Sequence, residues 1–145
     1  MNEQTATATP KHLWVVGILA TLWNSVGCVD YFMTQTKNMN YLKAFTPEQI
    51  DYFGAFPAWA DAAWALGVWG ALAGSILLLL RQRFAVHAFG LSLLGMAVAF
   101  LYQFGLSDAL ALFGAGPSLF TLVIVVIGIA LFVYARKMAA RGVLG

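Results

Sequence analysis

The sequence predicts an all-α integral membrane protein, a four-helix bundle with a short interfacial helix in its first outer loop. Of the 145 residues, 61% are hydrophobic and only 10% are charged, whereas soluble domains carry about 25% charged residues. The apolar residues form four runs, and each run, at ~20 residues, is long enough to cross ~30 Å of hydrocarbon as a helix. Strands of a membrane β-barrel would be about half as long and would alternate polar with apolar residues, which these runs do not.

The expected organisation is one membrane domain between two short polar ends. Residues 1–12 are predicted to be a flexible cytoplasmic N-terminus, residues 13–139 the membrane domain and residues 140–145 a cytoplasmic tail. The run that follows Lys11 is too long for the apolar core of a signal peptide, so we expect it to be retained as the first span. The expected spans are 13–33, 57–80, 84–104 and 117–135.

Two of the spans and the helix of the first loop begin with a recognisable signal. Pro57 and Pro117 suit the first turn of a helix, where a missing N–H costs nothing. Between the first two spans, Thr46-Pro47-Glu48-Gln49 has the pattern of a capping box with proline at the first helical position. Aromatic and aliphatic residues follow, which predicts a short helix on the membrane surface. This helix would serve either as a connector or as a lid over an outward-facing opening.

The cations predict the orientation of the bundle. Cytoplasmic loops of membrane proteins carry an excess of lysine and arginine. One side of the expected membrane domain has Lys11, Arg81, Arg83, Arg136, Lys137 and Arg141, and the other side has only Lys37 and Lys43. This asymmetry predicts a multi-pass protein of the bacterial inner membrane with both termini in the cytoplasm. Residues 34–56 and 105–116 would then face outward.

Small residues on the second span predict how the helices pack. Gly67, Gly70, Ala71 and Gly74 recur at helical spacing. In lipid, small residues allow helix backbones to approach closely, because packing rather than exclusion of water drives their association. We expect these residues to hold the bundle together, although the same surface could instead mediate self-association.

Polar and aromatic residues predict a ligand pocket in the outer third of the membrane. Polar side chains inside a membrane cost free energy unless they are paired or hydrated, and in this orientation all four spans contribute such groups at a similar depth. Asp30 and Asp61 have no lysine or arginine within the spans to neutralise them; they could lie at the headgroups, pair with loop lysines, share a proton or bind a cation. The predicted ligand-binding residues are Asn24, Asp30, Tyr31, Asp61, Trp64, Tyr102, Gln103 and Thr121. For Asn24, a hydrogen bond between helices is the simpler interpretation.

Several classes of function lack their motifs. The chain has no glycine-rich phosphate loop, no nucleophile elbow and no zinc or haem ligand set. Its one cysteine, Cys28, excludes an internal disulfide and a cysteine-cluster metal site. The scattered cations do not suggest nucleic acid as a partner. We therefore expect no catalytic residues, no cofactor and no metal.

The stretch 22–70 also resembles a protein family. The matching pieces are Trp23-Asn24, Asp30-Tyr31, the run Phe45-Thr46-Pro47-Glu48-Gln49 and Phe56-Pro57-Ala58-Trp59. They are similar to a family of small, uncharacterised four-span inner-membrane proteins of proteobacteria that are often labelled sugar transporters. The resemblance covers nearly the whole chain and implies the same fold. In general size the chain also resembles DoxX-like four-helix proteins, at the level of fold only.

Three functional hypotheses remain open. The first is a transport or permeation subunit whose outward-facing pocket takes a small polar or cationic solute. One four-helix bundle has little room for a whole pathway, so this hypothesis implies a homo-oligomer or a larger membrane complex in the lipid bilayer. The second is a non-catalytic accessory or assembly subunit that uses the small-residue surface. The third is a quinone-linked membrane enzyme.

Overall fold

The protein is an all-helical bundle, as the sequence predicts. The computed structural model describes residues 8–107 and 109–145, and this part of the chain contains no strand. Four helical stretches in it are long and apolar enough to cross a membrane. They are α1 (Lys11–Gln35), α4 (Ala58–Leu79), α5 (Phe84–Phe100) continued by the π-helical η1 (Leu101–Leu106), and α7 (Ala115–Ala140). Of the predicted flexible N-terminus, residues 1–7 lie outside the described residues, and α1 already begins at Lys11.

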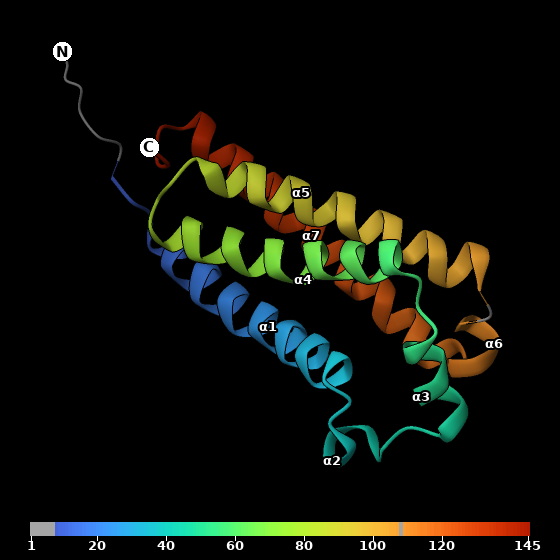
Figure 1. Ribbon diagram of the computed structural model, residues 1–145. Coiled ribbons are helices and arrows are strands. Elements are labelled where there is room, and N and C mark those ends of the chain that lie inside the picture. Colours follow the sequence, from blue (N-terminus) through green and yellow to red (C-terminus); the bar gives the residue numbers. More distant parts are fainter. Residues whose placement is uncertain (1–7, 108) are drawn as a thin grey trace.

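The long helices run side by side, with the start of α1 and the C-terminus at the same end of the bundle (Figure 1). We call this the terminal end. The opposite end carries three short helices, α2 (Met39–Leu42), α3 (Pro47–Gly54) and α6 (Ala109–Phe113), and we call it the loop end. Helix α4 packs against α1 on one side and against α5 on the other, and α5 also packs against α7.

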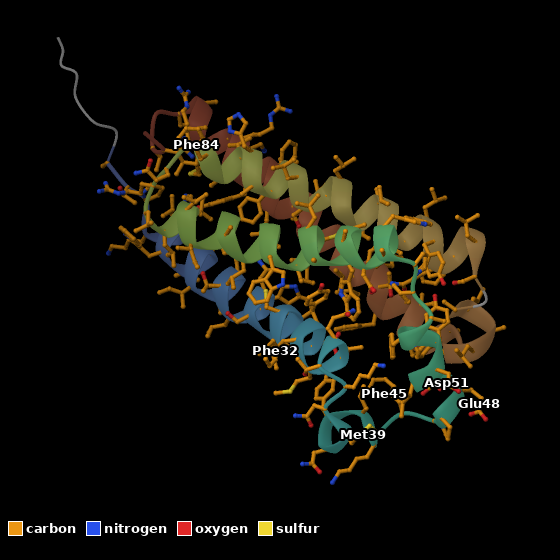
Figure 2. The ribbon with its side chains drawn as sticks, viewed as in Figure 1. Phe32, Met39, Phe45, Glu48, Asp51 and Phe84 are labelled. Atoms are coloured by element: carbon orange, nitrogen blue, oxygen red, sulfur yellow. The ribbon has the colours of Figure 1, made fainter. Side chains whose placement is uncertain are left out.

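Helix α3 is the short helix that the capping-box pattern predicts. The side chain of Thr46 accepts a hydrogen bond from the backbone N–H of Gln49 at 3.2 Å, and the Gln49 side chain accepts one from the Thr46 N–H at 3.1 Å. Figure 2 shows Glu48 and Asp51 on α3, at the loop end of the bundle. The loop end is more structured than the sequence analysis predicts, since α2 and α6 were not expected. Helix α2 does begin with an N-cap, because the side chain of Asn38 accepts a hydrogen bond from the N–H of Tyr41 at 3.1 Å.

Helices α4 and α5 approach closely because small residues line their contact. A Cβ atom added at Gly95 would lie 2.6 Å from the carbonyl oxygen of Ala63 and 2.7 Å from the nitrogen of Gly67. The hydroxyl of Ser92 donates to the Gly67 carbonyl at 2.6 Å, which pairs a buried polar group across the interface. At Gly70, an added Cβ would lie 3.3 Å from the Cα of Ser92.

The terminal half of the bundle is filled by a hydrophobic core. Phe89 of α5 lies against Gly74 of α4, where an added Cβ would meet the phenyl ring at 2.8 Å. The core cluster comprises Leu13, Ala20, Leu78, Ala85, Phe89, Leu131, Ala135, Met138, Val143 and Leu144. Interiors packed in this way leave few voids larger than a water molecule, so this half of the bundle is sealed.

The predicted C-terminal tail takes part in that core. Val143 and Leu144 are buried. The N–H of Gly145 donates to the carbonyl of Arg81 at 2.8 Å, and the N–H of Arg83 donates to the carbonyl of Gly145 at 3.0 Å. The last residues therefore fold back onto the turn between α4 and α5, a contact for which the sequence gives no signal.

Candidate functional site

A cavity of about 460 Å³ occupies the loop-end half of the bundle. All four long helices contribute to its wall, and α2, α3 and α6 add residues at the loop end. Most of the lining is aliphatic or aromatic. The polar lining residues are Asn24, Asp30, Tyr41, Tyr52, Gln103, Ser118 and Thr121. A cavity of this size, mainly apolar with a few polar groups, has the character of a small-molecule site.

The structure brings together part of the predicted pocket. Asn24, Asp30, Trp64, Gln103 and Thr121 all line the cavity. Tyr31, Asp61 and Tyr102 lie nearby but outside its lining. The ring of Tyr31 packs edge-on against Trp64 with centroids 4.9 Å apart, so Tyr31 contacts a residue of the cavity lining without lining the cavity itself. The ring of Tyr102 packs against Phe56 at 4.9 Å and against Trp59 at 5.6 Å.

Asp30 is the one charged residue among the described residues that line the cavity. Its carboxylate accepts a hydrogen bond from the hydroxyl of Tyr41, which α2 brings back over the end of α1. Burial, this hydrogen bond and the negative charge of Asp30 together raise the pKa of Tyr41 to about 12. Tyr41 is therefore protonated at neutral pH and remains a donor to Asp30.

Asp61 lies in a different place from Asp30. Its carboxylate accepts a hydrogen bond from the side-chain amide of Gln35 at 3.0 Å. It lines a second pocket at the loop end, to which Lys37 and Asp51 also contribute. The sequence assigns the two carboxylates to one layer, and this is wrong. Tyr31 packs against Trp64 and Gln35 bonds to Asp61, so Asp61 lies about one helical turn nearer the loop end than Asp30 and belongs to a different pocket.

Asn24 joins two helices at the floor of the cavity. Its side-chain nitrogen donates to the hydroxyl of Ser75 at 2.8 Å and to the carbonyl of Ala71 at 3.3 Å. The Ser75 hydroxyl in turn donates to the Ala71 carbonyl at 2.8 Å. Asn24 therefore has the interhelical role that its depth suggests, and it also contributes to the cavity lining.

Helix α3 covers the cavity at the loop end. Tyr52 and Phe53 of α3 line the cavity together with Phe113 of α6. Phe53 and Phe113 have ring centroids 5.5 Å apart, and the hydroxyls of Tyr52 and Ser107 lie 2.6 Å apart. The side-chain amide of Gln49 also donates to the carbonyl of Leu112 at 3.4 Å. These contacts tie α3 to α6 and to the end of η1, so α3 forms a roof.

Sequence reasoning missed Tyr41 and Phe113 as cavity residues. Both lie in short loop-end segments without strong periodicity, so their positions depend on how the loops fold back. The capping-box helix was a sequence signal for them, because a helix that returns toward the bundle brings the aromatic residues near it to the cavity.

The chemistry of the cavity is that of binding. It combines one carboxylate, one amide, hydroxyl groups and several aromatic faces. Among the described residues, no group of three or more histidine, cysteine or acidic side chains is arranged to hold a metal ion. Comparison of the chain with protein-family models, curated proteins and solved structures finds no match.

Proposed function

We propose that the protein is a small transport or permeation subunit of a bacterial inner membrane, and that its cavity binds a small polar or cationic solute. The excess of cations at the terminal end favours placing that end in the cytoplasm and the loop end outside. The resemblance to four-span proteobacterial proteins labelled sugar transporters agrees with this proposal.

One observation carries the proposal. Asp30 is the single charge among the described lining residues, and aromatic side chains share the cavity with it, among them Trp23, Trp64 and Phe45. A carboxylate next to aromatic faces is suited to an organic cation, because the ring faces attract positive charge and the apolar surroundings strengthen that attraction. A negative charge inside a membrane protein is costly unless it is paired or hydrated, so a bound cation would relieve that cost.

Because the terminal half is sealed, one protomer in this conformation offers a solute no complete path across the membrane. The cavity is a cup that ends at the Asn24 level, with the hydrophobic core beyond it. Passage of a solute through the membrane therefore requires either a rearrangement of that core or a pathway shared with other subunits. This is the physical reason for proposing a subunit of an oligomer or a larger complex.

The two aspartates provide a matched test. We expect Asp30→Asn to weaken binding of tetramethylammonium at least tenfold, the equivalent of ~1.4 kcal/mol, and to abolish its uptake in proteoliposomes. Asp61→Asn serves as the control, because Asp61 lies outside the cavity, and should leave binding within about twofold of the unmodified protein. Quenching of tryptophan fluorescence reports binding, since Trp23 and Trp64 line the cavity.

The rival hypotheses make different predictions. If the unmodified protein does not bind organic cations, or if Asp30→Asn binds them as well as the unmodified protein, the proposal is wrong. Foreign subunits that copurify in stoichiometric amount from mild detergent would then favour the accessory role. A bound chromophore in the purified protein would favour the quinone-linked enzyme.

A further inference from the structure

One seam of the bundle is packed differently from the others. Close backbone contacts join α1 to α4, α4 to α5 and α5 to α7, but α1 and α7 have no such contact surface. Side chains close this seam at two levels. At the terminal end, Nδ1 of His12 and the hydroxyl of Tyr134 lie 2.6 Å apart. Nearer the middle, the rings of Trp23 and Phe120 have centroids 5.8 Å apart.

The residues beside this seam belong both to the cavity and to the outer surface. Val26 of α1 and Phe120 of α7 line the cavity, yet they are 68% and 54% exposed. In a membrane-spanning helix, an exposed apolar side chain at this depth faces lipid acyl chains. The wall of the cavity between α1 and α7 is therefore thin and borders the bilayer.

The side of the cavity that faces water is better closed. The roof formed by α3 is attached by the Tyr52–Ser107 and Gln49–Leu112 hydrogen bonds and by ring contacts with Phe113. At the level of the cavity, the only ring contact found across the α1–α7 seam among the described residues is that of Trp23 with Phe120. Among the described residues, opening the seam at this level therefore breaks fewer hydrogen bonds and ring contacts than lifting the roof.

The lining also changes in character along the cavity. Asp30 and Tyr41 lie together toward the loop end, joined by their hydrogen bond. Beside the seam and toward the middle of the spans, the lining includes Val26, Phe120 and Ile124. A ligand that satisfies both regions has a charged head and an apolar tail.

From these observations we infer that the ligand is a single-chain amphiphilic cation that reaches the cavity from the bilayer through the seam between α1 and α7. Its cationic head lies at Asp30 and its tail runs between Val26 and Phe120. This inference rests on the proposed cation site and names the class of ligand that the site takes and the route that the ligand uses.

A chain-length series tests the class of ligand. The protein in lipid nanodiscs is titrated with tetramethylammonium and with butyl-, hexyl- and octyltrimethylammonium, and tryptophan fluorescence is recorded. The same titrations of Asp30→Asn give the fluorescence change caused by partition of each compound into the bilayer, and this change is subtracted. We expect the Asp30-dependent affinity to rise at least tenfold from tetramethylammonium to the octyl compound.

The outcomes separate the two proposals. If all four compounds bind with equal affinity and depend on Asp30, the cation site stands and the amphiphile is excluded. If none of them binds, the proposed function itself fails.

A crosslink tests the route. In a Cys28→Ser background, Trp23→Cys and Phe120→Cys place thiols on either side of the seam, and a short bifunctional maleimide joins them. We expect the crosslink to slow association of octyltrimethylammonium at least tenfold relative to the same variant before crosslinking. Trp64 remains as the reporter in the cavity.

The matched control is the same crosslink between His12→Cys and Tyr134→Cys, at the terminal end of the same seam and away from the cavity. It should leave association unchanged. Equal association rates before and after crosslinking at positions 23 and 120 would overturn lateral access, whatever the affinities.

Discussion

The close contact between α4 and α5 gives the sharpest prediction about stability. A Cβ added at Gly95 would lie 2.6 Å from the carbonyl oxygen of Ala63, whereas ordinary van der Waals contact begins at 3.4 Å. The obstacle is backbone and not a flexible side chain, so Gly95→Ala must separate the helices locally by about 0.8 Å, the difference between those two distances. This movement also lengthens the 2.6 Å hydrogen bond from Ser92 to Gly67.

The expected magnitude follows from two opposing effects. An extra methyl group in a well-packed interface costs ~1–3 kcal/mol, while alanine in a helix gains ~1 kcal/mol over glycine. We expect a net loss of up to about 2 kcal/mol for Gly95→Ala, and a stability about 1–3 kcal/mol below that of a control which gains the same helix propensity without the clash. The control is Gly116→Ala in the first turn of α7, where an added Cβ meets nothing within 4 Å; it should be neutral or slightly stabilising.

Unfolding of both variants by increasing mole fractions of sodium dodecyl sulfate in mixed micelles, followed by circular dichroism, measures the difference. If Gly95→Ala is as stable as Gly116→Ala, the described α4–α5 packing is wrong.

Three further predictions concern the loop end and the tail. Thr46→Ala removes the cap of α3, at a cost of ~1 kcal/mol, so hydrogen–deuterium exchange of residues 47–54 should accelerate about fivefold; unchanged exchange would contradict the capping role. Tyr41 should ionise near pH 12, and Asp30→Asn should lower this pKa toward ~10. Because the folded-state pKa is raised, the Tyr41 contribution to stability is complete below about pH 10 and is lost as pH rises through 12. Difference absorbance against Tyr41→Phe measures the ionisation, and a transition at the ordinary value would exclude the contact with Asp30. Leu144→Ala should lower stability by ~2 kcal/mol or more, because Leu144 is only 3% exposed; a stability equal to that of the unmodified protein would mean that the tail does not dock.

The four long helices were predictable from the sequence because lipid imposes simple requirements on length and polarity. Crossing the hydrocarbon requires about 20 apolar residues. Pro57 and Pro117 mark where two spans begin, and the Arg81-Gln82-Arg83 turn separates two others. The ends of the helices differ from the expected bounds by a few residues, as at α7, which runs to Ala140. Helix α3 was predictable as well, because its signal is local: Thr46 and Gln49 bond to each other.

The candidate site was only partly predictable, because a sequence gives the depth of a residue only approximately and does not give the direction of its side chain. Asp61 lies level with Gln35, about one helical turn nearer the loop end than Asp30, so Asp30 joins Tyr41 at the cavity and Asp61 joins Gln35 at a second pocket. Which face of a helix meets a given neighbour depends on the packing of the whole bundle.

Tyr41 and Leu144 reach their partners through chain segments that return to the bundle. Such contacts between residues distant in sequence leave no local pattern in a single sequence, so the Tyr41 contact and the docked tail could not be anticipated. The roof was one of the two roles that the sequence left open for the helix of the first loop.

The proposed function requires a ligand cavity in the loop-end half of the bundle and a sealed terminal half. Protection of a cavity thiol measures this most directly, in a Cys28→Ser background with Gln103→Cys in the cavity lining and Ala135→Cys in the sealed core. We expect a small maleimide to label the thiol at position 103 and octyltrimethylammonium to slow this labelling, while the thiol at position 135 remains unlabelled. Labelling at position 103 that no cation slows, or equal labelling at both positions, would contradict this expectation.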